Sequence, residues 1–214
     1  EVPAHWEVRP IRRTSTFVTS GPRGWSDFIS EEGTLFVQSG DLDDEQNVLW
    51  QSAKRVNLNQ ADLAEAARTR LLEGDVVVCI TGAKTGNVAI VRDVTEPAHI
   101  NQHLCLIRPT AEVRAVFMGR YLASETGQRF LLLAQYGLKQ GLGLDDIKSV
   151  SMPVPPVDEQ DEIALTIDHL SGQMNQLMSH AQTVIATLQE RRSALISAAV
   201  TGQIDVRGAP EQAP

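Results

Sequence analysis

The last quarter of the chain carries an apolar repeat that constrains the fold more than any other feature. From residue 163 onward, apolar side chains recur at alternating steps of four and three residues, which is the spacing of a coiled-coil seam. At about 1.5 Å per residue, the stretch 163–198 forms a helix roughly 54 Å long, more than a domain of this size needs to cover its core. Arg191 interrupts the seam. The seam positions are Ile163, Ile167, Leu170, Met174, Leu177, Ala181, Val184, Leu188 and Leu195.

The residues around this repeat indicate where the helix starts and stops. Pro155 and Pro156 disfavour helix immediately before it, and Asp158 is the expected N-cap. Gly202 is a natural stop. The alternative of a core helix within a bundle would need a second repeat of similar length, and the sequence contains none. We therefore expect the seam to pair with a helix from another chain.

The preceding residues predict a small mixed domain. The β-branched runs 75–81 and 87–92 flank the glycine-bounded turn 82–86, and this pattern predicts a β-hairpin. Short, irregular strands with polar loops favour a compact arrangement over a series of βαβ units. Other strand patterns cover 33–39, 100–108 and 148–154, and helical patterns cover 60–72 and 113–136 with a break near 126–127.

The expected fold class is therefore α+β, a small mixed domain followed by one long C-terminal coiled-coil helix. We assign the domain to residues 1–154 and the long helix with a C-terminal arm to residues 155–207. The Ala/Pro-rich residues 208–214 are expected to be a disordered tail.

Composition bounds the compartment and the partners. Cys79 and Cys105 lie in apolar strand-like runs, no run approaches about eighteen apolar residues, and no signal peptide opens the chain. We therefore expect a cytoplasmic protein that does not enter a membrane. The formal net charge is −8, of which residues 1–157 contribute −3. This argues against a nucleic-acid binder, but binding depends on the local field of one face, which net charge does not report.

Motifs for catalysis and for cofactors are missing. The turn 82–86 holds Lys84 and Thr85 between glycines but lacks the spacing of a phosphate-binding loop. His99, His103 and Cys105 lack a fourth metal ligand at normal spacing. The sequence offers no identifiable Ser-His-Asp arrangement, carboxylate pair or nucleophile elbow. We expect a non-catalytic protein without metal or cofactor, which favours a role in binding or assembly.

Several segments resemble the specificity (S) subunit of type I restriction-modification systems. The most specific motifs are the helix start PVPPVDEQDEIA (153–164) and the helix end LQERRSALISAAVTGQIDV (188–206). Upstream, TSGPRGW (19–25) resembles the family's entry loop, and LEGDVV (72–77), with the glycines at 82 and 86, resembles its hairpin. The similarity extends to Gly141-Leu142 before 145–148, where the family closes its target recognition domain, and so covers nearly the whole chain.

This resemblance implies a subunit that recognises double-stranded DNA and does no chemistry. Such a subunit delivers a methyltransferase (modification) subunit, and in restriction complexes a translocating nuclease subunit, to the site. A full S subunit carries two target recognition domains and two long helices that pair antiparallel, so this chain resembles a half-subunit. Its unpaired seam predicts a two-fold homodimer that reads a bipartite inverted site. A seam of roughly 54 Å limits the half-sites to about fifteen base pairs apart.

Hydrogen-bond donors and flat rings on glycine-rich loops are the expected DNA contacts, because such side chains reach phosphates or base edges. Two of the loops have a structural alternative. The turn at 19–26 could be one whose tryptophan packs on the core, and 136–144 could be a plain connection between a helix and a strand. The expected contacts are Ser20, Arg23, Trp25, Lys84, Thr85, Lys139 and Gln140.

The sequence leaves three other interpretations open. The chain could be a fragment of a two-domain S subunit whose sister domain is cut away or supplied by another chain. It could be a coiled-coil scaffold protein without DNA binding, which the negative charge permits. It could also be an enzyme whose site the motifs above do not reveal.

Overall fold

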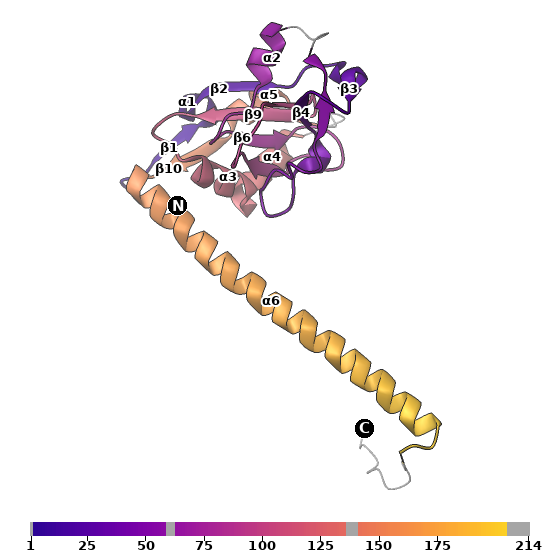
Figure 1. Cartoon of the computed structure of the whole chain (residues 1–214). Helices are drawn as coiled ribbons and strands as arrows, with labels where there is room; N and C mark the ends of the chain where they lie inside the picture. Colours follow the sequence, from indigo (N-terminus) through magenta and orange to yellow (C-terminus); the bar gives the residue numbers. More distant parts are fainter. Residues whose placement is uncertain (1, 59–62, 136–140, 205–214) are drawn as a thin grey trace. The chain divides into compact units, whose positions relative to one another are not determined.

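The computed structural model describes residues 2–58, 63–135 and 141–204. The chain divides into two compact units, Glu1–Ala164 and Leu165–Pro214. The first unit is an α+β domain, and the second consists of most of a long helix and the residues that follow it (Figure 1).

A four-stranded antiparallel sheet lies at the centre of the first unit. Val76 pairs with Ile90 in the two strands that flank the turn 82–86, which confirms the predicted hairpin. The strand order is β2 (Ser15–Ser20), β9 (Leu104–Pro109), β6 (Val76–Cys79) and β7 (Val88–Ile90).

Both faces of this central sheet are buried, and successive residues of β6 and β9 alternate between two cores. Val76, Val78, Cys105 and Ile107 belong to the core beneath the helices. Val77, Cys79, Leu104 and Leu106 belong to the core shared with a second sheet. Because side chains alternate across a strand, a strand covered on both sides needs an unbroken apolar run. This explains the runs VVVC and LCLI in the sequence.

The second sheet has a parallel strand pair and a separate outer core. Its order is β3 (Ile29–Ser30), β5 (Lys54–Val56), β4 (Thr34–Val37) and β8 (Ala98–Ile100), with β4 and β8 parallel. Leu35 and Val37 face the central sheet, whereas Phe36 joins Trp25, Val56 and Ala66 in a small core on the other face. Ala66 comes from α2 (Leu63–Thr69).

Short helices cover the opposite face of the central sheet. Their buried side chains include Ile11, Phe117, Leu131 and Ile147. A two-stranded sheet completes the unit, and in Figure 1 it lies on the far side of the domain from β3. The helices are α1 (Ile11–Thr14), α3 (Ala115–Ala123), α4 (Glu125–Ala134) and α5 (Leu144–Ser149), and the two strands are β1 (Glu7–Pro10) and β10 (Ser151–Val154).

The observed elements differ from the predicted ones in several places. The break within 113–136 falls at Ser124, whose hydroxyl caps α4 by accepting the Gly127 N–H at 3.3 Å. The strand expected at 148–154 begins only at Ser151, because α5 continues to Ser149. The run 100–108 is interrupted between β8 and β9. Strands β1 and β2 occupy a segment for which no strand was predicted.

Helix α6 (Val157–Val200) starts inside the first unit. Its first turn contains Asp158, so this residue lies within the helix instead of capping it. Gln160 is fully buried, and its side chain accepts the Arg114 N–H and donates to the carbonyls of Glu112 and Pro155, each at 2.8 Å. One buried side chain thus satisfies three backbone groups of the domain.

We expect Gln160→Ala to lower the free energy of unfolding by about 2–4 kcal/mol, because it leaves these three backbone groups without their partner. Urea denaturation at fixed protein concentration measures the loss. Gln176→Ala is the matched control, since Gln176 is exposed on the same helix and its replacement should change stability by less than about 0.5 kcal/mol. A variant at position 160 as stable as the control would contradict the assigned role.

Beyond Ala164, most apolar side chains of α6 are exposed in the single chain. Met178 and Ile185 flank the seam on one side, and together with it they form what we call the α6 stripe. The helix ends at Val200, two residues before the predicted stop Gly202, which has φ +73°, and the N–H of Gln203 bonds Ala198 O at 2.8 Å. The stripe side chains that are 54–63% exposed are Leu170, Met174, Leu177, Met178, Val184, Ile185, Leu188 and Leu195.

Candidate nucleic-acid interface

Four segments meet at one end of the central sheet, which we call the loop edge. They are the loop after β2 (21–24), the β6–β7 loop (80–87), the turn before β9 (101–103) and the residues before α5 (141–143). Backbone hydrogen bonds join them: Gly21 N–H to Leu104 O at 3.4 Å, and Ile80 N–H to His103 O and Leu142 N–H to Ile80 O, both at 2.8 Å. The structure therefore brings together loops that the sequence marked separately as DNA contacts.

The loop after β2 is held tightly at its base. A Cβ on Gly21 would lie 2.2 Å from the carbonyl oxygen of Ile100, so only glycine allows this approach. Ser20 is half-buried at the end of β2, and its carbonyl accepts a hydrogen bond from the Arg68 guanidinium at 2.9 Å. Arg23 is exposed. The loop thus presents one cation on a fixed backbone, which suits contact with a phosphate.

Trp25 supports this loop from beneath. Its side chain is 2% exposed, and its ring lies 6.1 Å from Phe36 and 5.5 Å from His99, measured between ring centroids. This differs from the expectation of an exposed flat ring and matches the alternative in which the tryptophan packs on the core. We therefore assign Trp25 to the support of the loop and not to its outer surface.

His99 is a buried neutral group in the same cluster. Burial lowers the pKa of His99 from 6.5 to about 4, and the nearby Arg70 acts in the same direction. Its Nδ1 lies 3.3 Å from Thr69 Oγ1. The unfolded chain binds a proton here near pH 6.5 and the folded chain only near pH 4, so stability is lost as pH falls through that window.

We expect His99→Gln to flatten the pH dependence of stability. Between pH 7 and pH 4.5 the wild-type protein should lose about 1–3 kcal/mol through this histidine, and the variant should not show that part of the loss. Urea midpoints measured at both pH values for both proteins give the difference. An identical acid destabilisation in the variant would exclude His99 as its source.

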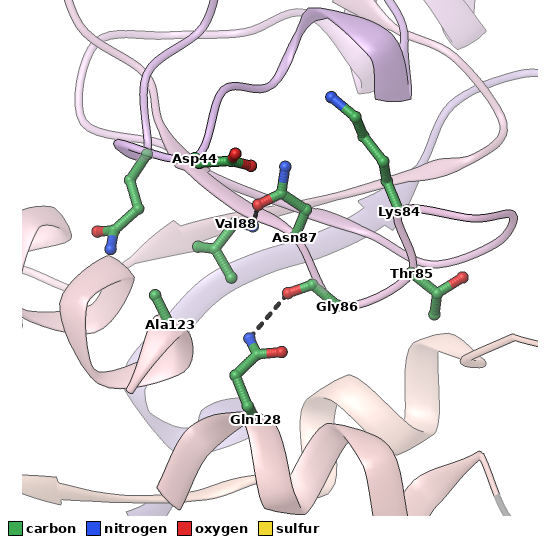
Figure 2. A pocket seen from close by; sticks show the side chains of 9 residues that line it. Asp44, Lys84, Thr85, Gly86, Asn87, Val88, Ala123 and Gln128 are labelled. Carbon is green, nitrogen blue, oxygen red and sulfur yellow. Dashed lines mark hydrogen bonds between the residues drawn. The ribbon is translucent and has the colours of Figure 1, made fainter. Parts of the chain in front are cut away.

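The β6–β7 loop borders a hollow of ≈ 390 Å³ (Figure 2). Lys84 is exposed, and its ammonium donates to Leu42 O at 2.9 Å. The Thr85 hydroxyl donates to Gly82 O at 2.6 Å, and Gln128 of α4 donates to Gly86 O at 2.9 Å. The residues that line the hollow are Asp44, Gln46, Lys84, Thr85, Gly86, Asn87, Val88, Ala123 and Gln128.

The last expected loop is described only in part. Lys139 and Gln140 lie outside the described residues. Gly141, which follows them, has φ +126°, and a Cβ there would lie 2.8 Å from Ile80 O. The chain therefore enters the loop edge immediately after the two predicted contacts.

Sequence reasoning missed the turn between β8 and β9. Gln102 is half-buried and His103 exposed at this turn, and Thr81 lies beside them in the β6–β7 loop. The apolar pattern of 100–108 predicts a single strand, and the polar pair Gln102-His103 within it is the available signal of a turn.

The described residues hold no group of three or more His, Cys, Asp or Glu side chains able to bind a metal ion. Within the same residues, no helix is both long and apolar enough to span a bilayer. Both thiols are buried and free; burial raises the pKa of Cys105 to about 12 and also raises that of Cys79.

Comparison with known proteins gives a family match and a relative. The family described as the type I restriction modification DNA specificity domain matches residues 26–186. The type I restriction enzyme EcoBI specificity subunit of Escherichia coli is 22% identical over 181 residues, covering 81% of this chain. The chain spans only 36% of the length of that subunit.

Solved structures show the same fold, a mixed domain followed by a long helix, as predicted. The HsdS subunit of Thermoanaerobacter tengcongensis matches with TM-score 0.70 and 16% identity over 100% of this chain and 53% of its own. A structure from work on complex assembly and conformational transition of the type I R-M system matches with TM-score 0.71 and 18% identity over 93% of this chain and 46% of its own. The S subunit of M. genitalium matches with TM-score 0.54 and 16% identity over 84% of this chain and 43% of its own. Since the family match covers most of the residues, this chain belongs to the specificity (S) subunit family of type I restriction-modification systems.

Proposed function

We propose that this chain is the non-catalytic DNA-recognition component of a type I restriction-modification complex. Its mixed domain reads one half-site through the loop edge, and α6 pairs antiparallel with α6 of a second copy. The observation that carries the proposal is that one chain holds both a set of converging polar loops and a long helix whose apolar stripe is exposed.

The loop edge supports the DNA-binding part of this proposal. Arg23 and Lys84 are exposed cations on loops with fixed backbones, and Ser20 and Thr85 add hydroxyl groups beside them. Cations on such loops neutralise phosphates and set the orientation of a domain on duplex DNA. Salt screens charges that lie farther from the DNA than the Debye length, so only the charged groups close to the DNA affect binding. The net charge of −8 therefore does not oppose DNA binding by the loop edge. We also propose that Lys139 and Gln140, in the segment before Gly141, contact the DNA.

The α6 stripe supports the pairing part. Covering a half-exposed aliphatic side chain contributes about 1 kcal/mol, so eight such side chains on each of two helices contribute about 16 kcal/mol. This exceeds the cost of association, about 4–15 kcal/mol. A helix pair of this kind is therefore expected to hold two copies together in solution.

The charges on α6 favour an antiparallel over a parallel pair. Acidic residues lie near its start, at Glu162 and Asp168, and near its end Arg191 and Arg192 outnumber the neighbouring Glu190, with no Asp, Glu, Lys or Arg between 169 and 189. Antiparallel pairing brings each acidic end toward a basic end, whereas parallel pairing places like charges together. Two antiparallel copies would hold their domains apart and leave the DNA between the half-sites unread.

One alternative has an observation in its favour. The relatives are about twice as long as this chain, so a sister half on another chain could cover the same stripe. The proposed binding of a methyltransferase subunit is compatible with either partner, a second copy or a sister half, because both assemblies contain two recognition domains and a helix pair. The oligomeric state of the purified chain separates the two.

Sedimentation equilibrium and DNA selection test the proposal together. We expect a dimer at micromolar concentration, and we expect the chain with a type I methyltransferase subunit to select an inverted bipartite site. The logarithm of its affinity should fall linearly with the logarithm of salt concentration. A monomer would point to the sister-chain form. No affinity for any duplex, with or without the methyltransferase subunit, would eliminate the recognition role, and turnover by the chain alone would contradict its non-catalytic nature.

A further inference from the structure

We propose that Gln102 reads a base edge and that His103, fixed by Thr81, positions it, so that these residues determine part of the sequence specificity. This proposal rests on the DNA-recognition function above. It assigns discrimination between bases to these three side chains, which we call the reader cluster, and leaves charge attraction to the exposed cations of the other loops.

The turn that carries Gln102 and His103 is rigid at both ends. On one side, the Asn101 N–H bonds Val37 O of the second sheet at 3.0 Å. On the other, the Leu104 N–H bonds Asn101 O at 3.1 Å as the chain enters β9. Asn101 is buried, and its side-chain oxygen accepts the His103 N–H at 3.1 Å. Base reading needs this kind of support, because a mobile side chain loses entropy on binding.

The side chains of the cluster also fix one another. His103 Nδ1 is hydrogen-bonded to Thr81 Oγ1 of the neighbouring β6–β7 loop. Its Nε2 lies 3.4 Å from the Gln102 amide nitrogen. In the tautomer with the proton on Nδ1, the His103 ring donates a hydrogen bond to Thr81 Oγ1, and its Nε2 accepts one from the Gln102 amide. The imidazole is thereby held between two loops while its residue stays exposed at the loop edge.

The chemistry of the cluster matches base edges better than phosphates. An amide offers a donor and an acceptor side by side, which is the pattern that pairs with adenine N7 and N6 in the major groove. A hydroxyl can donate or accept toward several bases. A phosphate offers hydrogen-bond acceptors only, so the acceptor oxygen of an amide finds no partner there. A cation would bind a phosphate at least as well as the amide.

The test is selection of bound sites from randomised duplexes by the full chain together with its methyltransferase subunit. Gln102→Ala and His103→Ala should each relax discrimination at one or two positions in each half-site by roughly 10- to 100-fold. Binding to non-specific DNA, and the salt slope, should stay near the wild-type values. In contrast, Lys84→Ala should weaken binding to all sequences and reduce the salt slope by about one.

The matched control is Thr95→Ala, an exposed loop residue at the opposite end of β7 from the loop edge. It should select the wild-type site with unchanged discrimination. Thermal unfolding of each variant shows whether the fold is retained, and a conservative His103→Asn variant gives a second measure if the alanine variant is unstable. If the wild-type chain selects a site and both the Gln102 and His103 variants select the same site with equal discrimination, the reader cluster is wrong. If the wild-type chain selects no site, the proposed function itself fails.

Discussion

Leu177→Glu should dissociate the proposed homodimer. Leu177 is 63% exposed near the middle of the stretch 163–198, and seam position 184 lies equally far from the centre of that stretch on the other side. In an antiparallel two-fold pair, Leu177 of one copy therefore meets the region of Val184 of the other. Leu177→Glu would bury an unpaired charge twice in each dimer, because the symmetry repeats it.

We expect the dimer dissociation constant of Leu177→Glu to rise at least 100-fold, or about 3 kcal/mol. Analytical ultracentrifugation across a concentration series measures it. Gln176→Glu is the control, since it adds the same charge one residue away, about 100° around the helix and outside the α6 stripe. The control should dimerise like the wild-type protein. Equal dissociation constants for all three proteins would show that the α6 stripe does not form the interface.

The same substitution separates assembly from reading. The monomeric variant keeps an intact loop edge and should still bind one half-site. Its affinity for the full site should fall, because one domain can no longer increase the effective concentration of the other at the second half-site. Half-site affinity should therefore remain near its wild-type value while the preference for the inverted site is lost.

The long helix could be predicted because its signals are local. Its seam repeats within the helix itself, and the prolines before it and Gly202 after it mark its limits. The structure places its first residue at Val157, one residue before the expected N-cap. What the local pattern could not reveal is the role of Gln160, which depends on the backbone at Glu112 and Pro155 coming together in the fold.

The strands of the domain were predictable only where burial of both faces requires a continuous apolar run in the sequence. Strands β6 and β9 are continuous apolar runs for that reason. Strands β1 and β2 have mixed composition, and they form because β10 and β9, far along the chain, supply their hydrogen-bond partners. Pairing over such sequence separations leaves no local period to detect.

The candidate interface shows the same division between local and non-local information. Glycine-rich composition was enough to mark the loops that hold Arg23 and Lys84. That these loops meet follows from the strand order β2-β9-β6-β7, which no single segment encodes. The burial of Trp25 and the turn at Gln102 and His103 likewise depend on the second sheet packing beside the first.

Removing one heptad from α6 should shorten the unread spacer of the DNA site. Deleting 172–178 removes seven residues from each helix and keeps the α6 stripe in phase on either side of the deletion. The paired helices then shorten by about 10 Å, so the two domains approach by at most about three base pairs. The bases read within each half-site should not change, because the loop edge is untouched.

A deletion of five residues, 172–176, provides the decisive comparison. It removes less length, but it rotates the following part of the stripe by about 140° around the helix axis and so breaks the apolar surface into two faces. We expect this variant to lose dimerisation and with it the bipartite site, although its helix is longer than that of the seven-residue deletion. Mapping methylated positions with the methyltransferase subunit measures the spacer in each case. An unchanged spacer in a dimeric seven-residue deletion would mean that α6 does not set the distance between the half-sites. A five-residue deletion that still dimerises would mean that pairing does not depend on one continuous stripe.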